Sequence, residues 1–229
     1  MKQDLYLGNN IEILDSIDVD WSKTIFVTDP PFNIGYHYHT YKDKMPKQDY
    51  WDFIKSVMRS DKQVLIHYSE SLFEYAVSIG QSPTKFVSWV YNSNTAKQHR
   101  GIAFWNVKPD FRKVGQPYKN PNDKRIAKRI AEGKKARLYD WWNINQVKNV
   151  SKEKTEHPAQ MPLEVMENII GILPEGYTIV DPFMGSGTTA LACKKYNRDF
   201  IGIEMDELYF NIAQKRLNEE AHQDLYAVL

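Results

Sequence analysis

The sequence predicts an α/β fold in which helices cover a mostly parallel β-sheet. Short apolar runs rich in β-branched residues recur along the chain, as is typical of buried strands. Runs with apolar residues at helical spacing lie between them. Strands that alternate with helices indicate a parallel sheet, because parallel strands need a long crossover connection.

The expected elements follow in order. We expect strands at residues 24–28, 63–68, 85–91, 177–181 and 199–204, and helices at 49–60, 163–173, 188–196 and 206–218. The first of these helices places Tyr50, Phe53, Ile54 and Val57 on one face. We see no internal repeat and no low-complexity tract.

Residues 94–155 break the alternation, because they are rich in Gly, Pro, Asn and Lys, with one basic amphipathic helix expected near 122–132. We therefore divide the chain into a first half of the domain at 1–93, an insertion at 94–152 and a second half of the same domain at 153–229.

Charge is unevenly distributed, although the net charge is only +1. Residues 97–154 hold 16 Lys or Arg and 5 Asp or Glu, whereas the rest of the chain holds 14 basic and 24 acidic residues. Aromatic residues lie among the basic ones, unlike in a disordered tail. The segment is therefore expected to meet a polyanion, and a solvated loop is the alternative.

The composition indicates a soluble protein of a reducing compartment. The chain has 229 residues, 42% of them hydrophobic, and a single cysteine, Cys193, so no intrachain disulfide can form. The first ten residues, MKQDLYLGNN, contain no apolar run typical of a secretion signal, and no stretch reaches membrane-spanning length.

The stretch IVDPFMGSGTTALA at 179–192 joins an expected strand to an expected helix through a glycine turn. Gly185 and Gly187 let the backbone approach a ligand closely, and the helix that follows presents unpaired N–H groups. Glu204 ends the next expected strand, where a carboxylate can accept bonds from ribose hydroxyls. The turn lacks both GxGxxG and GxxxxGK spacing, so it indicates a nucleoside site rather than a pyrophosphate site.

The stretch TDPPFNIG at 28–35 ends the first expected strand with a carboxylate, two prolines and an aromatic ring. Taken alone, an Asp-Pro step is common in turns that only end a strand. Beside the glycine turn, a catalytic turn is the better interpretation.

The chain resembles the amino-DNA methyltransferases in four stretches: LYLGNNIEIL at 5–14, TDPPFNIGYHYHTYKDKM at 28–45, HPAQMPLEVMENII at 157–170, and the block 178–217 that contains DPFMGSGTT. The order, with DPPF first and the glycine turn last, is similar to that of the beta class of the family. The resemblance implies a Rossmann-like methyltransferase fold with a seven-stranded, mostly parallel sheet and a target-recognition insertion. It implies S-adenosylmethionine as the cofactor and double-stranded DNA as the partner.

Two positions depart from the family pattern. Asn9 stands where the family usually has an acidic residue near the cofactor adenine, so the charge is lost while an acceptor oxygen remains. Met161 stands where the family commonly has Lys, so the role of that Lys is not carried over.

The catalytic turn is assigned to Asp29, Pro30, Pro31 and Phe32. An exocyclic base amine is a poor nucleophile because its lone pair is delocalised into the ring. Two acceptors directed at its N–H bonds, the Asp29 carboxylate and the Pro30 carbonyl, would free that lone pair for in-line attack. Phe32 would stack on the extruded base, which is worth about 1–3 kcal/mol and offsets the few kcal/mol that base flipping costs.

The resemblance implies a cofactor pocket made of Asn9, Gln160, Asp181, Phe183, Gly185, Gly187, Thr188, Thr189 and Glu204. In it the two threonines meet the methionyl carboxylate, Asp181 meets the ammonium group and Glu204 takes the ribose hydroxyls. Thr188 has an alternative interpretation as part of the helix start.

The DNA contacts are expected from two segments. The loop at 33–47 is predicted to close over the flipped base, with Tyr36 and Tyr38 touching DNA. In the insertion, the candidates for phosphate and base contacts are Arg100, Arg112, Arg125, Arg129 and Arg137. His37 and His39 form an HxH pair without a third ligand at metal spacing, so we expect no metal.

We expect methylation of adenine N6, because cytosine-N4 members of the family more often carry Ser at the position of Asp29. Cytosine N4 stays the near alternative. An RNA or protein-glutamine methyltransferase is a further alternative, although its turn usually begins with Asn, and an inactive DNA-binding module is the last. The resemblance also suggests a homodimer, leaves room for a cognate restriction endonuclease, and places the protein in a bacterial or phage-infected cytoplasm on DNA, away from membranes.

Overall fold

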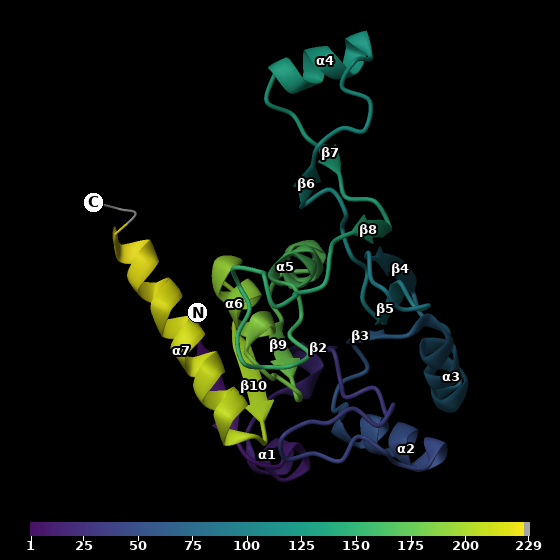
Figure 1. Cartoon of the computed structure of the whole chain (residues 1–229), viewed down its shortest axis with the longest axis vertical. Helices are drawn as coiled ribbons and strands as arrows, with labels where there is room; N and C mark the ends of the chain where they lie inside the picture. Colours follow the sequence, from purple (N-terminus) through teal and green to yellow (C-terminus); the bar gives the residue numbers. More distant parts are fainter. Residues whose placement is uncertain (227–229) are drawn as a thin grey trace.

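An eight-stranded sheet forms the centre of the computed structural model, which describes residues 1–226, with side chains as far as residue 219 (Figure 1). Its strands are β1 (Gln3–Leu7), β2 (Thr24–Thr28), β3 (Gln63–His67), β4 (Lys85–Val90), β5 (His99–Trp105), β8 (Trp141–Asn143), β9 (Thr178–Asp181) and β10 (Phe200–Glu204). They lie in the order β1-β10-β9-β2-β3-β5-β4-β8. The α/β class and the mostly parallel sheet are confirmed, with eight strands in place of the seven expected.

Two layers of helices cover the sheet. The helices are α1 (Asn10–Ser16), α2 (Lys47–Val57), α3 (Ser69–Ile79), α4 (Lys124–Ala131), α5 (Leu163–Ile172), α6 (Thr188–Lys195) and α7 (Glu207–Tyr226), and a 3-10 turn at Trp21–Lys23 precedes β2. Side chains of α5, α6 and α7 pack on one face of the sheet, and those of α1, α2 and α3 pack on the other (Figure 1). The helices that the sequence did not predict are α1 and α3.

Strand β2 shows why an apolar, β-branched run predicted a buried strand. All five of its residues are buried, with Ile25 and Val27 in the core under α5 and α6, and Phe26 in the core under α1 and α2. Successive side chains of a strand point to opposite faces, so a strand covered on both faces must be apolar throughout. Parallel pairing with β3 and β9 holds it in the middle of the sheet.

The strand order reverses between β9 and β2, and this places the ligand crevice. The chain leaves β2 through α2 towards β3, and leaves β9 through α6 towards β10, in the opposite direction. Such a switch point opens a crevice at the carboxyl ends of the strands. The turns after Thr28 and Asp181 both begin there.

Strand β5 lies inside the stretch that the sequence assigned to the insertion 94–152, so that boundary needs correction. It pairs antiparallel with both β3 and β4, and β8 also joins the sheet beside β4. A hairpin needs no crossover helix, so the rule of alternating strands and helices does not find it. The polar run at 91–98 is the hairpin loop.

The part of the insertion that does project is an arm at residues 115–137. The short strands β6 (Gly115–Gln116) and β7 (Ala136–Arg137) pair antiparallel at its base, and α4 lies at its tip (Figure 1). Asp123 caps α4 by accepting bonds from the backbone N–H groups of Arg125 and Ile126. The basic helix expected near 122–132 is confirmed.

Cys193 is buried in α6, and burial raises the pKa of its thiol. No helix in the described part of the chain combines the length and apolar character that a membrane span requires.

Gly101 offers a test of the antiparallel strand. A Cβ at this position would come within 2.4 Å of Phe86 Cζ and 2.6 Å of Leu72 Cδ1. We expect Gly101→Ala to lower the free energy of unfolding by about 1–3 kcal/mol, because the crowded side chains leave their preferred rotamers. Urea denaturation measures it, and an unchanged midpoint would contradict the packing described for β5.

Candidate active site

One cavity of about 470 Å³ opens at the carboxyl edge of the sheet, at the switch point. Its walls include the carboxyl ends of the five parallel strands β1, β2, β3, β9 and β10, the loop at 33–45 and the segment at 157–161. All four residues of the predicted catalytic turn line it, as do Tyr36, Tyr38, Arg100 and eight of the nine predicted cofactor residues, all but Gly187. The turn and the glycine block, about 150 residues apart in sequence, thus share one cavity.

The catalytic turn is braced from behind by a buried tyrosine. Tyr50 of α2 donates a hydrogen bond from its hydroxyl to the carbonyl of Pro31, at 2.8 Å. The same hydroxyl lies 3.1 Å from His67 Nε2 at the end of β3. His67 Nδ1 accepts from the backbone N–H of Tyr68, so the proton is assigned to Nε2, which donates to Tyr50. Burial lowers the pKa of His67 to about 3, which keeps the ring neutral and the tautomer fixed.

Asp29 is the residue of the catalytic turn whose carboxylate borders the cavity. Its Oδ1 is buried and accepts no hydrogen bond from the described residues, although its side chain borders the cavity. Burial raises the pKa of Asp29 to about 7, the cation of Arg100 opposes that rise, and Asp181 adds to it. A buried acceptor oxygen without a partner, in a side chain that borders a cavity, is a group available to a ligand.

Arg100, which the sequence predicts as a DNA contact of the insertion, lies on β5 at the edge of the cavity. One of its guanidinium nitrogens lies 3.6 Å from Asp29 Oδ2, and its guanidinium carbon lies 4.6 Å from the centre of the Phe32 ring. The reason is the reversed strand: His67 pairs with Gly101, so the amino-terminal end of β5 lies beside the carboxyl end of β3. Arg100 therefore lies in the sheet rather than on the projecting arm, and its predicted contact with DNA stays a prediction.

The glycine turn bends as expected. Gly185 and Gly187 have φ angles of +54° and +79°, which residues with a side chain rarely adopt. The Glu204 carboxylate accepts from the backbone N–H groups of Gly185 at 2.8 Å and of Asp206 at 2.9 Å, so it ties this turn to the end of β10. Burial raises the pKa of Glu204, and the two amide bonds oppose the rise.

Asp181 has a structural set of partners. It accepts from Thr28 Oγ1 at 2.7 Å, from the backbone N–H of Phe183 at 3.1 Å and from Thr189 Oγ1 at 2.6 Å. Burial raises its pKa to about 6, and these hydrogen bonds oppose the rise. Asp181 thereby joins β2, β9 and α6 directly beneath the cavity.

Three other predicted cofactor residues hold backbone as well as lining the cavity. Asn9 caps α1 by accepting from Ile11 and Glu12 N–H groups. Gln160 accepts from Thr155 and donates to the carbonyl of Glu153. Thr188 donates to the carbonyl of Met161, at 3.2 Å.

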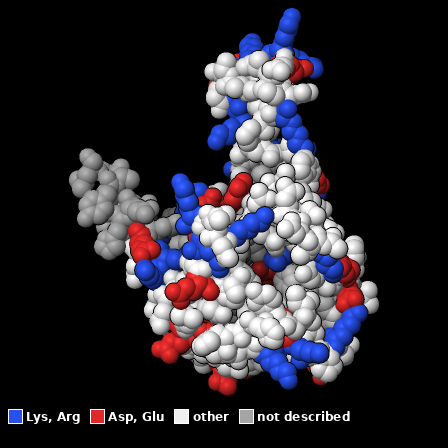
Figure 2. All heavy atoms as spheres, viewed as in Figure 1, with Lys and Arg blue, Asp and Glu red and all other residues white. Residues whose placement is uncertain are grey.

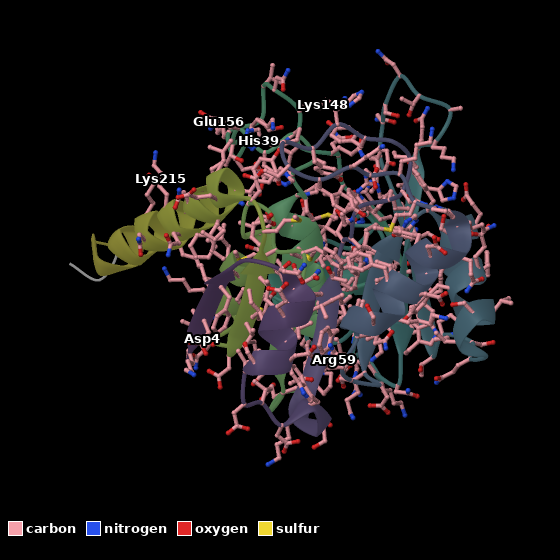
Figure 3. All side chains as sticks on the ribbon, turned by 90° about the horizontal axis from the view of Figure 1, so that it is seen from below. Asp4, His39, Arg59, Lys148, Glu156 and Lys215 are labelled. Atoms are coloured by element: carbon pink, nitrogen blue, oxygen red, sulfur yellow. The ribbon has the colours of Figure 1, made fainter. Side chains whose placement is uncertain are left out.

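The loop at 33–45 is organised by one buried carboxylate. Asp43 accepts from the backbone N–H groups of Asn33 at 2.7 Å, and of Ile34 and Tyr36 at 3.1 Å each. Further along, His39 and Thr40 reach Asp206 at the start of α7, with 2.9 Å and 3.0 Å separations, and Figure 3 shows His39 near that end of the helix. The loop therefore crosses the cavity from the catalytic turn to the cofactor side.

The remaining predicted DNA contacts lie away from the cavity. Arg112, Arg125, Arg129 and Arg137 are exposed, the last three on the arm, where basic side chains gather in Figure 2. Arg112 and Arg125 also pair with Asp110 and Asp123 in solvent. His37 and His39 join no cluster of three or more metal-ligating side chains among the described residues.

Several residues of the site escaped the sequence analysis: Asn10, Asp43, Tyr50, His67, His157, Asp206 and Tyr209. His67 and Tyr68 end a predicted strand at the same edge as Asp29, which could have pointed to them. Asp43 gives no such indication, because its partners are backbone amides of the irregular loop that it organises. Asp206 stands directly before α7 and accepts from the backbone N–H groups of Leu208 and Tyr209, so its place at a helix start was the available signal. Tyr50 was predicted only as a core residue of a helix.

The known proteins to which this chain is similar are DNA methyltransferases. The model of the N6/N4 DNA methylase family matches residues 24–215. The Type II methyltransferase M.HpaI of Haemophilus parainfluenzae is 27% identical over 96% of this chain and 76% of its own length. The crystal structure of the M1.HpyAVI–SAM complex is 26% identical, with a TM-score of 0.58, over 94% of this chain and all of that one. The cytosine-N4-specific PvuII DNA methyltransferase shares the fold at 18% identity, with a TM-score of 0.66, over 93% of this chain and 86% of that one.

Asp43 allows a test of how the loop at 33–45 is held. Asp43→Ala leaves three backbone N–H groups without their acceptor, at about 1–3 kcal/mol for each that stays buried. We expect faster tryptic cleavage after Lys42 and Lys44, measured by limited digestion. Asp123→Ala, which removes a cap from α4, is the matched control and leaves those sites as slow as in the wild type. Equal rates in all three proteins would contradict the role of Asp43.

Proposed function

The chain belongs to the N6/N4 DNA methylase family, and we propose that within it this protein methylates the N6 amine of adenine in duplex DNA. Membership makes it a DNA methyltransferase that uses S-adenosylmethionine. The choice of base and the residue roles are the proposed part. The observation that carries them is the buried Asp29 oxygen, unpartnered among the described residues, at the edge of the cavity.

The residues of the cavity fit the cofactor. Phe183, Ile203 and Met205 give apolar walls for a purine ring, and the Glu204 carboxylate keeps acceptor capacity for ribose hydroxyls beyond its two amide bonds. Asp181 provides negative charge for an ammonium group. Gly185 presents no side chain to a ligand in the turn. We therefore assign the cofactor to the part of the cavity between Asn9 and the start of α6.

The cofactor supplies an electrophilic methyl group on a good leaving group, so the protein contributes mainly position. The Asp29 carboxylate accepts a hydrogen bond from one N–H of the target amine, and the carbonyl of Pro30 accepts from the other. Because of these two bonds, the nitrogen lone pair is less delocalised into the base ring and is free to attack the methyl group. Proline has no N–H, so no donor of its own competes at this turn. Holding two reactants in such an arrangement is worth roughly 7–11 kcal/mol.

The support of the turn explains how the two acceptors keep their places. Tyr50 holds the carbonyl of Pro31, the residue after Pro30, and His67 holds Tyr50. Phe32 stacks on the His67 ring, with centroids 4.1 Å apart. Carbonyl, phenol and imidazole form one chain of donors and acceptors that leaves Pro30 and Asp29 facing the cavity.

The arm at 115–137 is proposed to meet the DNA backbone. Lys and Arg gather on it, and α4 alone carries Lys124, Arg125, Lys128 and Arg129. Contacts of this kind supply affinity that falls steeply with salt, and they position the duplex. A homodimer and a cognate restriction endonuclease remain proposals on the strength of the resemblance to Type II methyltransferases.

Adenine is favoured over cytosine by the carboxylate at position 29, since cytosine-N4 members more often carry Ser there. Cytosine N4 is the second candidate, because the same acceptors suit either amine and a cytosine-N4-specific enzyme shares the fold. RNA or protein-glutamine substrates are disfavoured by Asp29 and the basic arm.

The product identifies the base directly. DNA from cells that express the protein is digested to nucleosides and analysed by mass spectrometry, and we expect N6-methyladenine. Asp29→Ala should reduce methyl transfer by about 10²–10³-fold, in line with the loss of one preorganised polar group. Cofactor binding by the variant serves as its control. N4-methylcytosine as the product would refute the choice of base, and full activity of the variant would refute the role of Asp29.

Tyr50→Phe tests the support behind the turn. The change removes the hydroxyl that holds Pro31, so we expect about 1 kcal/mol of lost stability and a fall in kcat on the order of tenfold. Tyr75→Phe is the matched control, because its buried hydroxyl donates to Gln63 Oε1 at 2.7 Å, away from the cavity. The control should lose similar stability with a normal kcat. Equal kcat values for both variants would show that Tyr50 only stabilises the fold.

A further inference from the structure

Arg100 lies where an extruded base would have to stack. Its guanidinium carbon is 4.6 Å from the centre of the Phe32 ring, and its side chain is only 18% exposed. His67 covers Phe32 from the interior and does not line the cavity, whereas Arg100 and Phe32 both do. The guanidinium therefore covers the side of the ring that faces the cavity.

Arg100 and Asp29 lie within ion-pair distance but form no hydrogen bond with each other. The nearest nitrogen–oxygen distance is 3.6 Å, longer than the 2.7–2.9 Å typical of a charge-assisted hydrogen bond. Arg100 Nε and Asp29 Oδ1 are both buried and both lack a hydrogen-bond partner among the described residues. These two atoms belong to side chains that line the same cavity, and each is buried without a hydrogen-bond partner. Such a donor and such an acceptor indicate that each has another partner during the reaction cycle.

The chemistry of an extruded nucleotide matches both open groups. Its base brings an amine, which is a donor for Asp29, and its backbone brings a phosphodiester, which is an acceptor that suits a planar guanidinium. Trp89 and Tyr91 line the other side of the guanidinium, with ring centres 5.3 Å and 6.0 Å from its carbon.

We propose that Arg100 is a gate of the target-base site, which occupies the base position between Phe32 and Asp29 in the free enzyme and moves to a phosphate of the extruded nucleotide in the complex. This inference rests on the proposed function of the cavity in DNA methylation. In the free enzyme Arg100 keeps a cation beside Asp29. On base entry Asp29 exchanges that cation for the amine, while Arg100 exchanges the carboxylate for the phosphate.

The charged groups around Asp29 make the exchange measurable. Arg100 faces it from β5 and Asp181 from β9, and the phenols of Tyr38, Tyr50 and Tyr91 also contribute. Burial raises the pKa of each of these phenols, so they stay neutral while Asp29 titrates. Burial raises the pKa of Asp29 to about 7 even with Arg100 beside it, so loss of that cation raises the pKa further.

The pH dependence of the kinetics separates the free enzyme from the complex. The profile of kcat/KM reports the groups of the free enzyme, and that of kcat reports those of the complex. Asp29 must be ionised to accept the amine, so activity falls as pH drops through its pKa. For Arg100→Met we expect the acid limb of kcat/KM to move about one to three pH units higher, while the acid limb of kcat stays in place. Movement of both limbs, or of neither, would overturn the gate.

The salt dependence tests the destination of Arg100. The DNA is a duplex that carries the sequence methylated by the wild type, identified by sequencing modified DNA from expressing cells. Arg100→Met should reduce the slope of log affinity against log salt by about one, as expected for one lost phosphate contact. An unchanged slope overturns the phosphate contact. Arg59→Met is the control, because Arg59 pairs with Asp15 at 2.6 Å and lies outside the cavity; it should leave profiles and slope as in the wild type.

A wild-type measurement covers the case in which Arg100→Met does not fold. A crystal structure of the wild type with its target duplex should place the guanidinium within hydrogen-bond distance of a phosphate and the base over Phe32. A guanidinium that remains over Phe32 would overturn the gate. Failure of the wild type to methylate DNA would refute the proposed function instead, so the two failures are distinguishable.

Discussion

The burial of Asp29 at the point where the sheet reverses its order is the constraint on which the site depends. Desolvation disfavours its charged form, and the cation of Arg100 opposes that effect. The carboxylate is thus held near the balance between its two protonation states, with one buried oxygen that has no hydrogen-bond partner among the described residues.

Four other buried or nearly buried carboxylates show how different Asp29 is. Asp43, Asp181, Glu204 and Asp206 each accept at least two hydrogen bonds, most of them from backbone amides of turns around the cavity. Those carboxylates fix the loop at 33–45, the floor of the cavity, the glycine turn and the start of α7. Of these five described carboxylates, only Asp29 has an oxygen without a hydrogen-bond partner, and it is the one that we propose meets the substrate.

Elements defined by their own residues were predictable from the sequence, whereas elements defined by pairing with distant segments were not. The strands at 24–28 and 199–204 were predictable, because residues covered on both faces must be apolar at every position. Strand β5 was assigned to the insertion, because its place depends on pairing with β3 and β4 rather than on its own pattern. The short helix α1 was missed although Asn9 caps it, since the resemblance had already given Asn9 a ligand role.

The sequence by itself determined the class of fold, the family resemblance with its cofactor, and the residues of the two turns, because these depend on local periodicity and on contiguous motifs. Only the tertiary structure decided the neighbours of those turns. It brought Arg100 to Phe32 through a reversed strand, Tyr50 to Pro31 from a helix, and Asp206 to the loop at 33–45. Each of these contacts joins segments that lie far apart along the chain, and their separation in sequence carries no information about their distance in space. The path of the backbone through the sheet sets that distance.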